Sequence, residues 1–225
     1  LRLVGSEMCI RDRASIPFDK LGGKLWYNGE MVDWDEGRLH ILSHGLHYGS
    51  CVFEGERAYG GKIFKHQEHT DRLFKSAEIL GMDIGYSNKE LYDAAYTSLE
   101  AQGFTDAYVR PVAWRGSEMM AISAQQTTTH VAVICWDMGS YFDPEARMAG
   151  IKLQWAKYKR PSPECAPVHA KAAGLYMICT VSKHEAEAQG FNDAIMLDWR
   201  GYVAECTGAN LSLIHISEPT RRNSI

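Results

Sequence analysis

The sequence predicts an α+β fold in two domains, on three observations. Two turn signals, Asn28-Gly29 and Gly60-Gly61, each separate short apolar runs, as in β-hairpins. Apolar residues at helical spacing follow these hairpins over a long stretch. Beyond a polar connection over 140–147, a loop, a helix and another hairpin are predicted, so we place the domain boundary in this connection.

Composition excludes several classes of protein. The chain has 225 residues, with 45% hydrophobic residues and a net charge of −4, which suits a soluble globular protein rather than one that binds nucleic acid or a membrane surface. It has no run of 18 apolar residues that could span a membrane, and no apolar secretory core at its start. Its six cysteines lack C-x-x-C spacing, which indicates reduced thiols in a cytoplasmic protein.

The strands of the first domain follow from alternation and turn chemistry. Lys24–Trp34 is predicted to form two short strands around its Asn-Gly turn. Tyr48 to Tyr59 alternates small and large residues and predicts one strand, which continues through the double glycine to Ile63-Phe64. Thr129–Trp136 is apolar throughout and predicts a buried strand.

Two helices and one further strand complete the first domain. His66–Leu80 and Asn88–Gln102 have the periodicity of amphipathic helices. Asp106–Trp114 is predicted to be a strand in which Tyr108, Arg110, Val112 and Trp114 share one face. Because proline cannot donate a ladder hydrogen bond, Pro111 predicts that this strand lies at an edge or a rim, with Arg110 facing a pocket or a partner.

Three histidines, His40, His44 and His47, lie close together in the sequence. A metal site needs convergent ligands, usually with an acidic or cysteine partner, and no predicted helix or hairpin supplies that geometry here. We therefore expect no metal and rank a metal-dependent hydrolase last among the alternatives.

The rest of the chain is organised around residues 163–176, which begin as a proline-containing loop. A helical pattern follows from about Ala172 to Gln189, and it places Lys171 at the junction of loop and helix. The positive end of a helix lowers the pKa of a nearby ammonium, and carbonyl chemistry needs an unprotonated amine. A strand over Ile151–Trp155 precedes this stretch, and a hairpin over Asn192–Glu205 follows it.

Three separated motifs then occur in the order found in a known enzyme family. They are His-Ala-Lys-Ala-Ala-Gly-Leu-Tyr (169–176), Gly-Phe-Asn-Asp-Ala-Ile-Met-Leu-Asp (190–198) and Gly-Tyr-Val-Ala-Glu-Cys-Thr-Gly-Ala-Asn (201–210). The chain resembles the fold-type IV pyridoxal-phosphate enzymes from about Phe18 to Asn210, and looks most like a branched-chain amino-acid aminotransferase. The resemblance implies a two-domain α+β fold with the first domain complete and the second truncated.

The resemblance also implies a set of cofactor-binding residues. Lys171 would form a Schiff base with pyridoxal 5'-phosphate and carry the α-proton, and Glu205 would pair with the pyridine nitrogen. Tyr176 would contact the ring hydroxyl, which requires Lys171 to lie outside the helix, because five helical steps do not return to one face. Arg72, in His-Thr-Asp-Arg-Leu, would bind the phosphate, whereas its alternative is an i,i+4 pair with Glu68. Without the resemblance, Glu205 would be a surface residue and Tyr176 a core residue.

For substrate binding, the resemblance implies that Tyr48 and Phe53 line an apolar side-chain pocket, Tyr48 from across the interface of a homodimer or higher homo-oligomer. Arg110, which shares its strand face with Tyr108, would lie on the side of the substrate carboxylate. The implied reaction is ping-pong transfer of the amino group from leucine, isoleucine or valine to 2-oxoglutarate. An apolar pocket gives only modest discrimination among these substrates.

The two ends do not continue these patterns. Leu3–Arg13 and Leu211–Arg221 resemble translated sequencing adapters, so we divide the chain into ends over 1–13 and 211–225 and domains over 14–145 and 146–210. The family's remaining phosphate-binding loops would follow Asn210. We therefore expect this chain to be inactive or poorly soluble, although its parent would be an enzyme.

Two other functions stay open. A D-amino-acid aminotransferase or an aminodeoxychorismate lyase would keep Lys171 and Glu205, and activity on leucine compared with D-alanine would separate them from a branched-chain enzyme. The chain could also be a non-catalytic remnant that binds cofactor without turnover.

Overall fold

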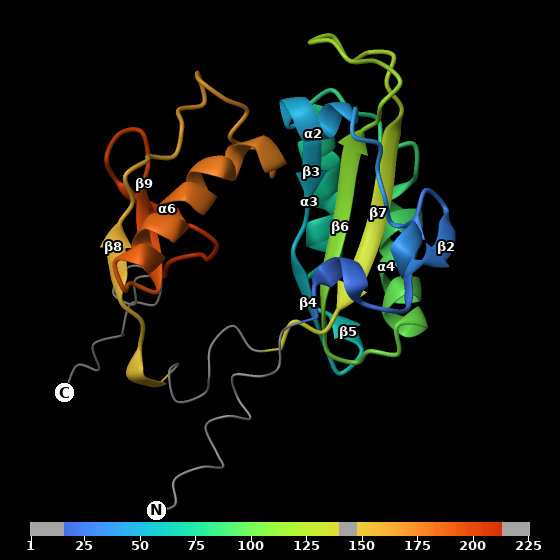
Figure 1. Cartoon of the computed structure of the whole chain (residues 1–225), viewed down its shortest axis with the longest axis horizontal. Coiled ribbons are helices and arrows are strands. Elements are labelled where there is room, and N and C mark those ends of the chain that lie inside the picture. The colour runs from blue at the N-terminus through green and yellow to red at the C-terminus, as the bar shows by residue number, and fades with distance from the viewer. Residues whose placement is uncertain (1–15, 140–147, 213–225) are drawn as a thin grey trace, which may run out of the picture.

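The computed structural model describes residues 16–139 and 148–212 and has the expected α+β architecture (Figure 1). One large antiparallel sheet with two helices forms the first unit, and a small sheet with one helix forms the second. The expected boundary over 140–147, the whole end over 1–13 and most of the end over 211–225 lie outside the described residues. Across the two described ranges, no helix is long and apolar enough to cross a membrane.

The large sheet has seven strands, all paired antiparallel. Its order is β2 (Glu30–Asp33), β1 (Lys24–Tyr27), β7 (Thr129–Trp136), β6 (Ala107–Arg115), β4 (Glu56–Tyr59) and β5 (Lys62–Ile63), with β3 (Cys51–Phe53) also paired to β6. The β1–β2 turn places Asn28 and Gly29 at φ values of 49° and 99°. This left-handed conformation is the one that two-residue hairpins need, so the first hairpin is confirmed.

The expected single strand from Tyr48 to Tyr59 is wrong. A short helix, α2 (His44–Tyr48), ends at Tyr48, and the strand that follows is interrupted between β3 and β4 at Glu54 and Gly55. A Cβ atom on Gly55 would lie 2.2 Å from the Tyr108 hydroxyl oxygen, so glycine is needed there to let the phenol reach the backbone. Alternating side-chain size does not reveal this interruption, because it arises from a contact with another strand.

The expectation that Pro111 marks a sheet edge is also wrong. Strand β6 is central, with β7 on one side and β3 and β4 on the other. The Pro111 carbonyl accepts a hydrogen bond of 2.9 Å from the Glu54 backbone N–H. The N–H and carbonyl of one strand residue point to the same side, so the N–H that proline lacks would have faced the interruption between β3 and β4. The interruption therefore removes the usual cost of proline in a central strand.

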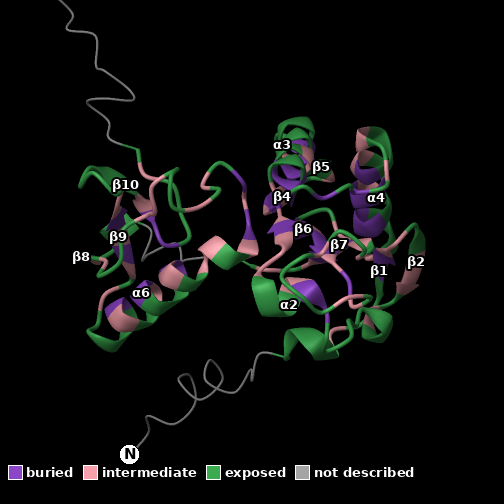
Figure 2. Cartoon of the chain, turned by 90° about the horizontal axis from the view of Figure 1, so that it is seen from above, coloured by how far each residue is buried: buried purple, intermediate pink, exposed green. Residues whose placement is uncertain are grey.

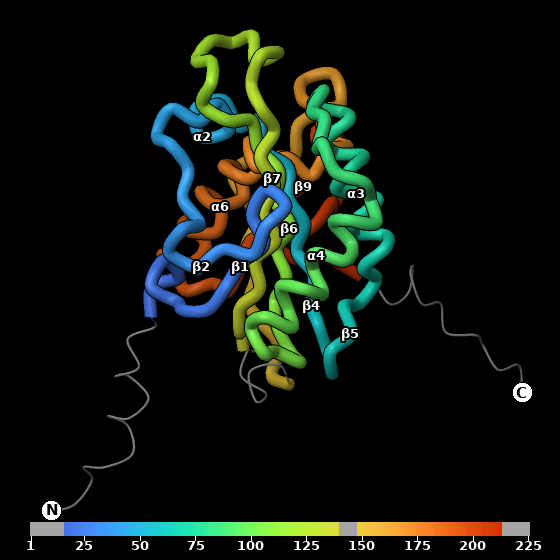
Figure 3. The backbone as a smooth tube through the Cα atoms, turned by 90° about the vertical axis from the view of Figure 1, so that its right-hand side faces the viewer, coloured from blue at the N-terminus to red at the C-terminus, as the bar shows by residue number. Residues whose placement is uncertain are grey.

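Helices α3 (His66–Ile79) and α4 (Asn88–Ala101) confirm the two expected helices and cover one face of the sheet, whereas α2 lies toward the other (Figure 2). They lie side by side along β6 and β7 (Figure 3). A capping box between Ser87 and Glu90 begins α4. Leu73 and Leu91 are among the largest fully buried side chains beneath these helices, and burial of each contributes about 1.5–3 kcal/mol.

The second unit contains β8 (Leu153–Trp155), α6 (Met177–Ala188), β9 (Asp193–Leu197) and β10 (Val203–Cys206). β8 pairs parallel with β9, and α6 connects them, while β9 and β10 form the expected hairpin. The expected helix start at Ala172 is wrong: Ala172 is extended and forms an isolated bridge with Val52, a 3-10 turn over Ala173–Leu175 follows, and α6 begins at Met177. Short 3-10 turns also cover Phe18–Lys20 and Trp34–Glu36.

Candidate functional site

The two units meet along the outer side of β3, where the segment containing Lys171 lies against it. The Lys171 carbonyl accepts a hydrogen bond of 3.2 Å from the Phe53 N–H, and Ala172 pairs with Val52 as an isolated bridge. The Lys171 N–H donates in turn to the hydroxyl of buried Ser76 on α3, at 2.9 Å. The backbone at Lys171 is therefore fixed from both sides, by a strand and by a helix.

The Lys171 side chain is half-buried, and its amine lies among aromatic rings. The amine nitrogen Nζ donates a hydrogen bond of 2.8 Å to the Tyr176 hydroxyl and lies 5.1 Å from the centre of the Phe53 ring. The Phe53 and Tyr176 rings contact edge to face, with centres 5.0 Å apart. The 3-10 turn between Lys171 and Tyr176 brings the two side chains together, and α6 begins only after Tyr176, as their meeting requires.

Arg110 lies over the same phenylalanine. Its guanidinium carbon is 4.7 Å from the centre of the Phe53 ring, and its NH2 group donates a hydrogen bond of 2.7 Å to the Tyr108 hydroxyl. The Arg110 Nε is buried without a hydrogen-bond partner in the described part of the chain. A buried, unused donor beside Lys171 is suited to a carboxylate or another acceptor from a ligand.

Arg72 lies on α3 and does not pair with Glu68, which forms an ion pair with Lys65 instead. Its Nε and NH2 groups donate to the two carboxylate oxygens of Glu54, both at 2.6 Å. The negative charge of a Tyr176 phenolate would interact with the Arg72 guanidinium, which places Arg72 within electrostatic reach of the Lys171 cluster. The hydrogen bond to Glu54 raises the pKa of Arg72 further above its ordinary value.

Glu205 lies on β10 and pairs with a residue to which the sequence assigned no role. Arg160 Nε lies 3.1 Å from a Glu205 carboxylate oxygen, and its NH1 group is 3.5 Å from the Leu175 carbonyl and 3.2 Å from the Cys179 sulfur. Arg160 therefore links Glu205 to the residue that precedes Tyr176. The sequence signal available was the basic run before the lysine stretch, which gives no partner.

Tyr48 is the sequence-predicted residue that the structure leaves apart. Its side chain is 47% exposed at the end of α2, and its ring packs on that of His44, with centres 4.6 Å apart. Among the described residues, no ring contact or hydrogen bond joins Tyr48 to the Lys171 cluster. The next residue, Gly49, does pack backbone to backbone against Gly174 in the 3-10 turn.

An apolar pocket of about 300 Å³ extends from this cluster along the same face of the sheet. Its wall includes Cys51, Val112 and Ala173, each two residues from Phe53, Arg110 and Lys171 respectively, together with Trp114. Burial raises the pKa of the Cys51 thiol to about 11, so this wall is uncharged at neutral pH. The sequence did not predict these residues as pocket residues, although strand alternation places them on the correct face.

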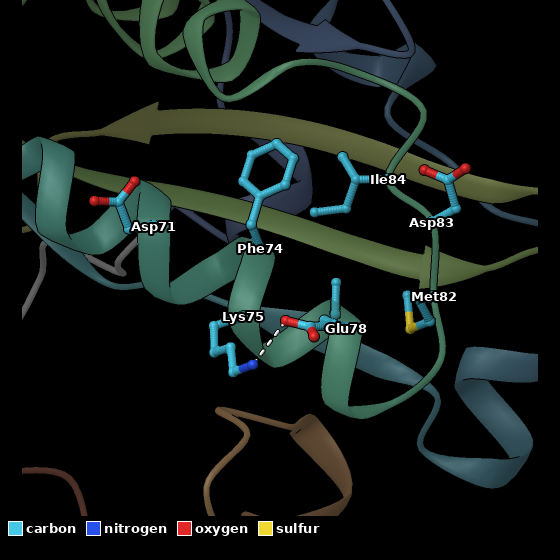
Figure 4. A pocket seen from close by; sticks show the side chains of 8 residues that line it. Asp71, Phe74, Lys75, Glu78, Met82, Asp83 and Ile84 are labelled. Atoms are coloured by element: carbon cyan, nitrogen blue, oxygen red, sulfur yellow. Dashed lines mark hydrogen bonds and ion pairs between the residues drawn. The ribbon is translucent and has the colours of Figure 1, made fainter.

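A second hollow lies along α3, between the helix and residues 82–84 (Figure 4). It is lined by Asp71, Phe74 and Glu78, among others, and Glu78 is paired with Lys75 at 2.8 Å. Asp71 accepts hydrogen bonds from Gln67 and Asn88. None of the residues that line this hollow belongs to the Lys171 cluster, and the described residues contain no group of three or more His, Cys, Asp or Glu that could hold a metal.

Comparison with known proteins gives a family match over most of the chain. The model of the family described as "Amino-transferase class IV" matches residues 51–218. A branched-chain-amino-acid aminotransferase of Pseudomonas aeruginosa is 40% identical over 196 residues, which cover 85% of this chain. The chain spans 64% of the length of that relative.

Solved structures are similar over the same region. The branched-chain aminotransferase of Thermoproteus uzoniensis with norvaline matches with a TM-score of 0.78 and 34% identity, over 84% of this chain and 64% of that one. A bacterial relative from T.th., the branched-chain amino acid aminotransferase with pyridoxamine 5'-phosphate, matches with a TM-score of 0.80 and 36% identity, over 84% of this chain and 63% of that one. The same enzyme complexed with 4-methylvaleric acid matches with a TM-score of 0.76 and 34% identity, over 83% of this chain and 62% of that one.

Proposed function

Because the chain belongs to the class IV aminotransferases, among the branched-chain amino-acid aminotransferases, we propose that it acts on the substrates of that group. The proposed reaction is transfer of the amino group between leucine, isoleucine or valine and 2-oxoglutarate, with pyridoxal 5'-phosphate bound at Lys171. The observation that carries the proposal is the 2.8 Å hydrogen bond between the Lys171 amine and the Tyr176 hydroxyl, beside Phe53 and Arg110.

The residues present fit this cofactor by their chemistry. The Lys171 amine could bind an aldehyde carbon, the Tyr176 phenol could contact the ring oxygen beside it, and Glu205 could hold a protonated pyridine nitrogen. Arg72 offers a guanidinium for the phosphate, since its side chain is 51% exposed even while it is bound to Glu54. A substrate carboxylate would find the unused Nε of Arg110.

When bound, pyridoxal phosphate supplies a carbonyl that condenses with amines and a ring that accepts electrons from the bond that breaks. The chain supplies positioning and proton transfer. Lys171 Nζ holds and moves the substrate α-proton, and the Tyr176 hydroxyl orients that amine through their hydrogen bond. The rings of Phe53 and Tyr176 shield the amine from water on two sides.

The substrate class is supported by the apolar pocket beside Lys171 and by the 4-methylvaleric acid held by a related enzyme. A branched aliphatic side chain fits a pocket with an uncharged wall. We further propose a homodimer in which exposed Tyr48 reaches the site of the partner subunit, and a cytoplasmic location, in which the five free cysteines of the described residues would stay reduced.

Borohydride trapping tests the proposal. The purified chain is incubated with pyridoxal phosphate, reduced with borohydride, digested and analysed by peptide mass spectrometry. We expect one reduced adduct, on Lys171, because this amine is half-buried beside a hydroxyl whereas exposed lysines such as Lys75 are solvated. The absence of an adduct on Lys171, with or without scattered modification of exposed lysines, would overturn the proposal.

The pocket makes a prediction about specificity. Replacing Val112 by phenylalanine adds bulk to the pocket wall, so we expect the KM for leucine to rise about tenfold or more while that for alanine changes little. Steady-state transamination assays with both amino acids measure this ratio. The control is Val181→Phe, at a residue on α6 that is 45% exposed and outside the pocket. Equal changes for leucine and alanine in Val112→Phe would contradict the assignment.

A further inference from the structure

We propose that Glu54 and His69 are positioning residues that hold the Arg72 guanidinium in the orientation that binds a phosphate monoester. The inference rests on the proposed function, because the phosphate is that of the cofactor at Lys171. It adds two residues that bind no cofactor atom themselves and act through Arg72.

Glu54 is a fully buried carboxylate, with 0% of its side chain exposed. It accepts three hydrogen bonds: two from Arg72, at 2.6 Å each, and one of 2.8 Å from His69 Nδ1. Burial alone would raise the pKa of Glu54, but the bonds from Arg72 and His69 outweigh it and keep the pKa below the ordinary value. The carboxylate is therefore charged, and it grips the guanidinium by two atoms rather than one.

The grip leaves one side of Arg72 available. Nε and NH2 are used on Glu54, whereas NH1 makes no hydrogen bond or ion pair within the described residues. The side chain remains 51% exposed, and the guanidinium lies within electrostatic reach of Tyr176. A planar fork held at two donors points its remaining donors in one fixed direction, which lowers the entropy lost when an anion binds.

His69 completes the arrangement. Its Nδ1 must donate, because an ionised carboxylate only accepts, and the ring is 23% exposed beside the guanidinium. The His69 donor occupies Glu54 Oε2 together with Arg72 NH2, which restricts where the carboxylate can rotate. Glu54 without His69 would keep its ion pair but lose this restriction.

The chain also explains why Glu54 and the Lys171 site belong together. Glu54 directly follows Phe53, whose ring lies beside the Lys171 amine. Side chains of consecutive extended residues point to opposite faces, so one peptide unit carries the ring toward Lys171 and the carboxylate toward α3. The Glu54 N–H is anchored on the Pro111 carbonyl at the interruption between β3 and β4. The interruption thus positions both the amine environment and the guanidinium.

The test compares pyridoxal phosphate with pyridoxal, which lacks the phosphate. Affinities of the full 225-residue chain for both are measured by absorbance titration, with the adduct on Lys171 quantified after borohydride reduction. In Glu54→Gln we expect affinity for pyridoxal phosphate to fall about tenfold or more, while affinity for pyridoxal stays within about twofold. His69→Asn should give a smaller loss with the same selectivity. Glu68→Gln, on the exposed side of α3, is the control and should change neither.

Equal losses for both ligands in Glu54→Gln would overturn the inference, because a general structural defect does not distinguish them. If Glu54→Gln does not fold, Arg72→Lys and His69→Asn still carry the test: both must weaken pyridoxal phosphate selectively, and a wild-type affinity ratio in His69→Asn would overturn the role of His69. If the wild-type chain forms no adduct on Lys171 with either ligand, the proposed function fails. If it forms adducts with equal affinity for both ligands, only the phosphate inference fails.

Discussion

Replacing Lys171 by alanine is expected to abolish the borohydride-trapped adduct and to lower transamination of leucine by a factor of about 10²–10⁴. The reason is that Lys171 supplies both the amine that bonds to an aldehyde and the base that moves the α-proton. Its nearest polar neighbour, Tyr176, is a phenol and cannot replace either role. Peptide mass spectrometry and an assay of 2-oxo acid formation measure the two losses.

Two variants make this result specific. Lys171→Arg retains a positive charge over the Phe53 ring but has no amine that can condense, so it should lose the adduct as completely as alanine does. Lys75→Ala removes an exposed lysine that is paired with Glu78 and should behave as the wild type. A Lys171→Ala chain that still transaminates leucine at more than a tenth of the wild-type rate would show that another amine carries the reaction.

Replacing Glu56 by glutamine is expected to lower the free energy of unfolding by about 3–5 kcal/mol at pH 6, because it removes one partner of a buried ion pair. His66 Nδ1 lies 2.6 Å from a Glu56 carboxylate oxygen, and His66 Nε2 lies 3.0 Å from the Tyr92 carbonyl. Both nitrogens face acceptors, so the ring is an imidazolium, and only 2% of its side chain is exposed. Urea unfolding monitored by circular dichroism measures the loss. Glu68→Gln, in the exposed pair with Lys65, is the control and should show no measurable change.

The same pair makes the loss depend on pH. Burial opposes the charge on His66, but the hydrogen bond and the charge of Glu56 outweigh it and raise the pKa of His66 above 6.5. A raised pKa in the folded state gives stability that is fully present below pH 6.5 and is lost as the pH rises through the folded value. The difference between wild type and Glu56→Gln should therefore shrink as the pH rises from 6.5. A difference that grows with pH would contradict the ion-pair assignment.

The local elements followed from the sequence because their causes are local. An Asn-Gly turn needs only its own two left-handed residues, and the first hairpin formed as predicted. The helices α3 and α4 begin and end within a residue of their predicted bounds, because helical periodicity and capping act over a few neighbouring residues. The errors fell where a distant strand intervened: at Glu54-Gly55, where Tyr108 approaches, and at Ala172, which pairs with Val52.

The sequence by itself determined the α+β class, most elements and the motif residues Lys171, Tyr176 and Glu205. It also determined that Lys171 and Tyr176 could meet only if the lysine lay outside the helix. Tertiary structure alone decided the partners: Glu54 rather than Glu68 for Arg72, and Arg160 for Glu205. Spacing rules describe contacts within one helix or strand, whereas these pairs join residues that only chain folding brings together, and burial makes each charge take the partner that folding supplies.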